Sequence, residues 1–158
     1  MKKQSLEISY GIYALDELPQ ENRKLIDAAL DAARRSYAPY SRFSVGAAVL
    51  LDNGVVVTGN NQENVAFPSG LCAERTALFY ANSQYPEVPV KALAIAARDS
   101  SGEVTRTPVS PCGACRQVML ETEKRFGKPI QVLLSDAEKV IVVNSATSLL
   151  PLAFSDIS

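Results

Sequence analysis

Three cysteines and one glutamate carry the residue types and spacing that could do chemistry. Cys112 and Cys115 stand three positions apart in the segment SPCGACRQVM, and Cys72 is followed two positions later by Glu74. Three thiolates suit zinc, which binds sulfur at about 2.3 Å and keeps a fourth position for water when the protein supplies three ligands. A carboxylate beside that water can accept its proton. The pattern favours a catalytic zinc site with Glu74 as the proton carrier.

Other interpretations of these residues stay open at this point. CGAC is similar to the active-site turn of thioredoxins, in which a helix N-terminus lowers the pKa of a thiol, so a thiol–disulfide oxidoreductase is one alternative. Ordinary buried cysteines are another, and Glu74 could simply face the positive end of a helix. A redox pair needs neither Cys72 nor Glu74, however, so their presence favours zinc.

Composition narrows the classes of function. The chain of 158 residues has 16 basic and 17 acidic side chains without a basic run, which disfavours a nucleic-acid partner. It contains no histidine, which excludes serine–histidine triads and every zinc site that needs imidazole. No apolar stretch has the length of a signal peptide or a membrane span, and three cysteines suit a reducing compartment, so we expect a cytoplasmic protein without a membrane partner.

The helices and strands that must position these residues are predicted from hydrophobic periodicity and from Gly, Pro and Asn residues, which mark turns and the ends of elements. The predicted helices run from Gln20 to about Tyr37, from about Cys72 to Ser83 and from about Cys112 to Gly127, with a short closing helix in ATSLLP. The predicted strands are Phe43–Leu51, Val55–Gly59, Val90–Ala97, Ile130–Leu134 and Val140–Val143. This order predicts an α/β fold of three layers, with a five-stranded mixed sheet and helices on both faces.

The first nineteen residues stand apart from this pattern. Leu6, Ile8, Tyr10 and Ile12 alternate with small or polar residues, which permits an added edge strand. We therefore divide the chain into an N-terminal extension at 1–19 and a single catalytic domain at 20–158.

The segments CAERTA and PCGACRQ, some forty residues apart, resemble those of the cytidine deaminases, specifically the small homotetrameric kind with three zinc-binding cysteines. The similarity extends from about Gln20 to Phe154. It implies that Cys72, Cys112 and Cys115 bind Zn²⁺ and that Glu74 carries protons. It further implies hydrolysis of cytidine and 2'-deoxycytidine at C4 of the pyrimidine, with release of ammonia, in pyrimidine salvage.

The resemblance also assigns residues to the nucleoside. NQENVAF is similar to the ribose-binding segment of the family, which implies that Asn61 and Glu63 hold the sugar hydroxyls. YSRFSVGAA matches a Phe-x-Val-Gly strand, so Phe43 is expected to pack against the pyrimidine, and Ala73 is expected to contact the substrate. The resemblance implies that Phe154 reaches the site of a neighbouring subunit.

Arg75 has a separate role by the same resemblance. Three thiolates on one zinc sum to a net charge of minus one, and two helix N-termini offset part of it. The family pattern implies that Arg75 adds a hydrogen bond to a ligand sulfur, where a surface salt bridge is the alternative. A deaminase of tRNA or of a nucleoside antibiotic would share this chemistry, but the absence of a basic groove and the presence of NQEN count against it.

The chain departs from the family at three positions. Val65 stands where alanine is usual, Phe67 where tyrosine is usual, and Ser44 where proline is frequent. Val65 and Phe67 lie near the expected sugar site, so subunit contacts there are expected to differ.

Overall fold

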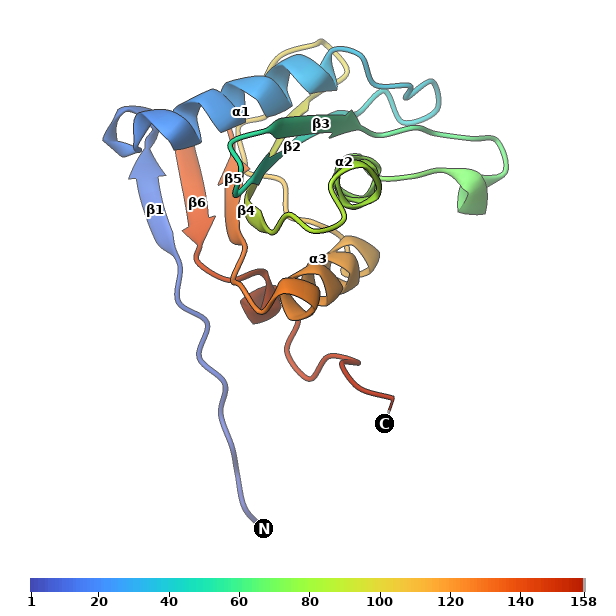
Figure 1. The fold of residues 1–158 in the computed structure, drawn as a ribbon. Helices are drawn as coiled ribbons and strands as arrows, with labels where there is room; N and C mark the ends of the chain where they lie inside the picture. Colours follow the sequence, from blue (N-terminus) through green and yellow to red (C-terminus); the bar gives the residue numbers. More distant parts are fainter. Residues whose placement is uncertain (158) are drawn as a thin grey trace.

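A mixed sheet lies between one helix on one face and two helices on the other (Figure 1). The computed structural model describes residues 1–157. Its strands are β1 (Gly11–Ala14), β2 (Ser44–Leu51), β3 (Val56–Asn60), β4 (Val90–Arg98), β5 (Gln131–Ser135) and β6 (Lys139–Val143). Its helices are α1 (Gln20–Ala33), α2 (Ala73–Gln84) and α3 (Gly113–Phe126), with short 3₁₀ segments η1 (Leu15–Glu17), η2 (Phe67–Ser69) and η3 (Ala146–Leu149). Within residues 1–157 we find no helix that is long and apolar enough to cross a bilayer.

The sheet has the strand order β1-β6-β5-β4-β2-β3, with β4 and β5 parallel and every other pair antiparallel. β4 lies in the interior of the sheet, where Ile95 pairs with Ala47 on one side and Leu134 on the other. Both faces of β4 are covered, which explains its nearly continuous apolar sequence. The three-layer mixed α/β fold predicted from the sequence is confirmed.

Two details differ from the prediction. The sheet has six strands where five were predicted, because Gly11–Ala14 adds an edge strand beside β6. Helix α1 ends at Ala33 instead of near Tyr37. The backbone of Tyr37 pairs with a different segment, since its N–H donates to the Asn61 carbonyl over 3.0 Å and its carbonyl accepts from Glu63 N–H over 2.8 Å. Those bonds are incompatible with a continued helix.

The helices approach the sheet closely where glycine replaces a side chain. A Cβ on Gly46 of β2 would lie 1.9 Å from the Ala29 carbonyl oxygen of α1. A Cβ on Gly59 of β3 would lie 2.5 Å from Ala77 N and 2.7 Å from the Ala73 carbonyl oxygen of α2. Gly59 therefore determines how closely the first turns of α2 rest on the sheet.

We expect Gly59→Ala to displace the start of α2, because the new methyl group would meet helix backbone, which cannot rotate away. Overpacking of this kind costs about 1–3 kcal/mol in the free energy of unfolding. Because α2 begins directly after Cys72, the shift should also weaken zinc binding. Chemical denaturation and zinc content measure the two effects. Thr58→Ala, an exposed position of the same strand, is the control and should change neither; an equal effect in both variants would contradict the role of Gly59.

Candidate active site

The three cysteines meet at the N-terminal ends of α2 and α3. Cys72 and Cys112 are the residues immediately before these helices, with extended backbone, and Cys115 lies buried in the first turn of α3. Cys72 Sγ lies 3.8 Å from Cys112 Sγ, which lies 3.5 Å from Cys115 Sγ, and all three sulfurs are within 4.8 Å of one another. Sulfurs bound tetrahedrally at 2.3 Å to one zinc ion would be about 3.8 Å apart. The donor set and its spacing fit zinc.

Packing on one face of the sheet brings the two helix ends together. Ala73, Ala77 and Ala81 form the buried stripe of α2, and Cys115 and Met119 belong to the same apolar cluster from α3. Small alanine side chains let α2 lie near the sheet. Both N-termini therefore point their unpaired N–H groups and positive helix dipoles toward the sulfurs.

The thiols respond to this environment in opposite directions. Burial raises the pKa of the Cys115 thiol well above its ordinary value. Burial also acts to raise the pKa of Cys112, but hydrogen bonds from the Cys115 backbone and with the Cys115 and Cys72 thiols outweigh it, so the pKa of Cys112 is lowered. The more exposed Cys112 is thus the easier of these two thiols to deprotonate.

Glu74 lies in the first turn of α2 and is only 5% exposed. Burial raises the pKa of its carboxyl above the ordinary value, against the effects of the helix backbone, of a hydrogen bond with Cys115 and of the Arg75 charge. A raised pKa makes a carboxylate a stronger proton acceptor, which suits a group that takes up a proton and returns it. Its position beside Cys115 places it at the cysteine cluster.

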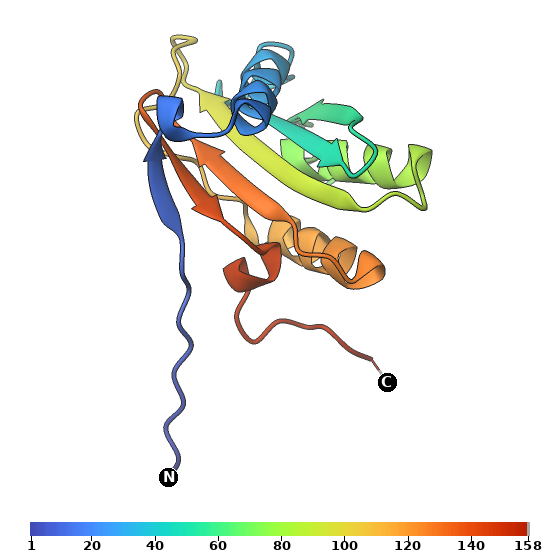
Figure 2. The ribbon, with the colours of Figure 1, turned by 60° about the vertical axis from the view of Figure 1, so that its left-hand side comes forward.

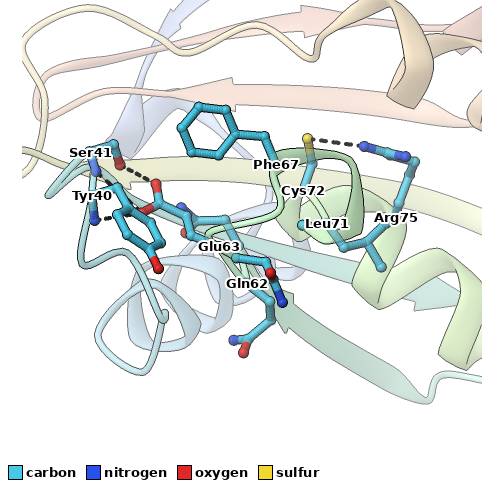
Figure 3. Close-up of a pocket in the computed structure, with 11 residues that line it drawn as sticks. Tyr40, Ser41, Gln62, Glu63, Phe67, Leu71, Cys72 and Arg75 are labelled. Carbon is cyan, nitrogen blue, oxygen red and sulfur yellow. Dashed lines mark hydrogen bonds between the residues drawn. The ribbon is translucent and has the colours of Figure 1, made fainter.

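Arg75 lies against the same sulfurs. Its Nη2 donates to Cys72 Sγ over 3.5 Å, and hydrogen bonding with Cys72 raises the pKa of the guanidinium (Figure 3). Its buried Nε has no hydrogen-bond partner among residues 1–157. A cation held against sulfur, rather than against a carboxylate, is what a negatively charged thiolate cluster requires.

A pocket of about 540 Å³ opens beside Cys72 and Arg75. Figure 3 shows these two residues at one end and Tyr40, Ser41 and Glu63 at the other. Asn61, Gln62, Asn64, Phe67, Gly70 and Leu71 complete its lining. The pocket is large enough for a small ligand and meets the cysteine cluster at one end.

Asn61 and Glu63 line this pocket but also hold its wall in place. Asn61 Oδ1 accepts from Val45 N–H over 2.8 Å, and its Nδ2 donates to the Phe43 carbonyl over 2.9 Å. Glu63 Oε2 accepts from the backbone N–H groups of Tyr40 and Ser41 over 2.9 and 3.2 Å, and its Oε1 accepts from the Ser41 hydroxyl. The Ser41 hydroxyl bond lowers the pKa of Glu63, which keeps this carboxylate ionised.

The structure does not bring the remaining predicted residues into the pocket lining of the same chain. Phe43 is half-buried immediately before β2, and Ala73 is completely buried as the first residue of α2. Phe154 lies on the outer side of α3, where its carbonyl accepts from Gln117 Nε2 over 2.8 Å, and its side chain is 71% exposed. An aromatic ring this exposed is available to another molecule.

Three further residues shape this region: Phe67, which the sequence marked only as a departure from the family, and Arg116 and Glu123, to which the sequence assigned no role. Phe67 is exposed over the pocket and meets the Tyr40 ring edge-on, at 6.3 Å between ring centres. Arg116 joins the carbonyls of Pro111 and Leu149 over 2.8 and 2.7 Å, so it ties the CGAC turn to the C-terminal segment. Glu123 is buried and accepts from the N–H groups of Ile130, Ala146 and Thr147 over 2.6, 2.8 and 2.9 Å. The bonds to Leu149, Ala146 and Thr147 join positions 33, 23 and 24 apart, so they leave no local signal in the sequence.

Comparison with known proteins gives a consistent result. A family model described as the cytidine and deoxycytidylate deaminase zinc-binding region matches residues 19–127. A cytidine deaminase of Halalkalibacterium halodurans is 42% identical over 134 residues, which cover 85% of this chain and 94% of that protein. A cytidine deaminase of Sporosarcina psychrophila is 43% identical over 132 residues, which cover 84% and 90%.

Solved structures agree in fold. The crystal structure of a cytidine deaminase from Burkholderia pseudomallei aligns with a TM-score of 0.71 and 41% identity over 83% of this chain and 97% of that chain. The cytidine deaminase of Mycobacterium tuberculosis aligns with a TM-score of 0.64 and 36% identity over 84% and 96%. The sequence and the three-dimensional arrangement therefore point to the same relatives.

Proposed function

The chain belongs to the cytidine and deoxycytidylate deaminase family of zinc-binding proteins, and from this premise we propose that it hydrolyses cytidine and 2'-deoxycytidine to the corresponding uridines and ammonia, in pyrimidine salvage. One observation carries the proposal. Three cysteine sulfurs converge within 4.8 Å, the buried Glu74 carboxyl contacts Cys115, and Cys72 of this cluster lines one end of a pocket of about 540 Å³. A thiol–disulfide enzyme needs neither a third thiol nor a buried carboxyl at this place.

In this proposal Cys72, Cys112 and Cys115 hold the zinc ion. When bound, zinc supplies a nucleophile at neutral pH by lowering the pKa of a coordinated water. Glu74 would accept one proton from the attacking water and pass it to N3 of the pyrimidine. It would then accept the proton of the hydroxyl newly bonded to C4 and pass it to the departing amino group, so every proton that it delivers is one that it has taken up. Burial raises the pKa of this carboxyl, which favours its holding a proton between the two transfers. Arg75 offsets the excess negative charge of the three thiolates.

The nucleoside occupies the pocket between Cys72 and Glu63. Asn61 and Glu63 contact the sugar hydroxyls with the hydrogen-bonding capacity that their backbone contacts leave free. Phe43 and the backbone around Ala73 complete the pyrimidine end. We further propose that the protein is a cytoplasmic homotetramer in which Phe154 of a neighbouring subunit stacks on the base.

Ammonia release from a panel of nucleosides tests the proposed activity. Purified zinc-loaded protein should release ammonia from cytidine and deoxycytidine, with matching formation of uridine and deoxyuridine. A tRNA substrate serves as the comparison, because no basic groove is expected. Deamination of tRNA without deamination of free nucleosides would overturn the assignment of substrate.

We expect Phe154→Ala to raise KM for cytidine roughly tenfold or more, because base–aromatic stacking contributes about 1–3 kcal/mol. Steady-state kinetics on the zinc-loaded variant measures the change. Complementation then tests whether the ring acts between subunits. Glu74→Gln subunits keep Phe154, whereas Phe154→Ala subunits keep Glu74, so co-refolded mixtures should contain some complete sites. Activity no higher than that of the diluted parents would show that Phe154 is a packing residue of its own chain.

Arg75→Ala should have a milder effect than loss of Glu74. The variant keeps the three thiols and the proton carrier and loses the cation that contacts Cys72 Sγ and interacts with Cys115. We expect zinc to be retained and kcat to fall, since the thiolate charge is less well compensated. Metal analysis and kinetics on the same sample measure both. Arg35→Ala, which removes an exposed ion pair with Asp31, is the control for loss of one positive charge. Equal activity in the two variants would contradict the role of Arg75.

A further inference from the structure

The edge strand β1 continues into an extended segment whose apolar side chains are uncovered. β1 is the outermost strand and pairs with β6 on one side. Residues 1–10, here called the N-terminal arm, precede it and project from the body of the molecule (Figures 1 and 2). Leu6, Tyr10 and Ile12 are 69%, 58% and 61% exposed. The family model matches residues 19–127, which do not include this edge.

The sequence of this edge lacks most of the features that normally prevent edge strands of two molecules from pairing. Natural edge strands are protected by proline, by lysine or by bulges. Residues 5–14 contain no proline and a single charged side chain, Glu7. Ile12 and Tyr13 lie on opposite faces of β1, because side chains alternate along a strand, and both are exposed. Ala14 N–H, at the end of β1, donates to Glu17 Oε2 over 2.7 Å, but ahead of it the edge and the arm offer backbone groups and apolar surface together.

We propose that this edge pairs in antiparallel fashion with the same edge of a second copy of this chain. The charges favour this partner. Lys2 and Lys3 begin the arm, and Asp16 and Glu17 directly follow β1. An antiparallel pair places the start of each arm beside the end of β1 in the other copy, so the lysines meet the acidic residues. The surface is complementary to itself, as a two-fold interface requires.

The apolar pattern selects the register. Four apolar side chains share one face of the extended chain: Leu6, Ile8, Tyr10 and Ile12. For these faces to lie on the same side of the joined sheet in both copies, residues opposite each other must be an even number of positions apart. Pairing centred on Ser9 sets Leu6 opposite Ile12 and Ile8 opposite Tyr10 of the second copy. The same register brings Lys2 and Lys3 near the η1 turn that carries Asp16 and Glu17. Ser9 then lies opposite Ser9 of the second copy.

Variants of the full-length, zinc-loaded protein in which one serine of the arm is replaced by cysteine test this arrangement. Under mild oxidation Ser9→Cys should form a covalent dimer, seen on a non-reducing gel, because directly opposed residues of an antiparallel pair lie within reach of each other. Ser5→Cys is the matched control, since in this register Ser5 lies opposite Tyr13 and not opposite itself. Wild-type protein gives the background from the three native cysteines.

A second variant tests whether strand pairing produces the cross-link. Adding Leu6→Asp and Ile8→Asp to Ser9→Cys should abolish the covalent dimer, because the carboxylates replace the apolar side chains that face Ile12 and Tyr10 of the second copy. Both side chains are exposed, so folding and deaminase activity should be retained. The proposal is overturned if Ser9→Cys stays monomeric on the gel, if Ser5→Cys cross-links equally, or if the dimer survives the two aspartates. None of these outcomes depends on the proposed catalytic function.

Discussion

Glu74→Gln should abolish most deamination while leaving the protein folded and loaded with zinc. The amide has nearly the volume of the carboxyl and keeps a hydrogen-bonding group in the first turn of α2, but it cannot take up and return protons. Removal of a general acid or base lowers turnover on the order of 10²–10⁴-fold. We expect this loss in kcat, with a much smaller change in KM, because the binding pocket is intact.

Metal analysis must accompany this measurement, since loss of zinc would produce the same inactivity for a different reason. Glu121→Gln is a matched control, because Glu121 is exposed on α3 and the substitution makes the same change of charge. Its activity should equal that of the unmodified protein. Near-normal turnover in a zinc-loaded Glu74→Gln protein would rule out Glu74 as the proton carrier.

Cys72→Ala should lose zinc and activity together. The substitution leaves two thiols, and an open site that already reserves one position for water then retains too few protein ligands to hold the ion. We expect zinc content to fall from about one ion per chain to near zero, and kcat to fall with it. Because metal binding contributes to folding, the variant should also unfold at a lower denaturant concentration than the zinc-loaded protein.

Two comparisons separate metal loss from general damage. Cys72→Ala should have about the stability of unmodified protein stripped of zinc with a chelator, because both lack the same ion. Added zinc should restore activity to the stripped protein and not to the variant. Full zinc content and activity in Cys72→Ala would show that Cys112 and Cys115 hold the metal without it, which would contradict the three-cysteine site.

Local pattern was sufficient for most of the fold. The strands around β4 and the three helices were predicted to within a few residues, because apolar periodicity and the punctuation by Asn53-Gly54 and Gly127 are properties of short segments. Where the prediction differed, a non-local contact was responsible. Tyr37 leaves the helical pattern because its backbone pairs with the segment at 61–63.

The sequence also determines which types of side chain are available for metal binding and proton transfer. Three cysteines, no histidine and a glutamate two positions after Cys72 are the basis on which the zinc donors and the proton carrier are proposed. The CxxC spacing predicts that Cys112 and Cys115 lie on one helix turn. The sequence alone does not predict that Cys72, forty positions away, lies 3.8 Å from Cys112.

Only the tertiary structure decided that distance, because it depends on how two helices pack against one face of the sheet. Gly59 and the alanine stripe of α2 allow the close approach that aligns the two helix ends. The same packing desolvates Glu74, and a shift in pKa depends on surroundings that no short segment contains. Residue identity sets which reactions are possible, whereas burial and distance, which arise from contacts between remote segments, set which of them this pocket can perform.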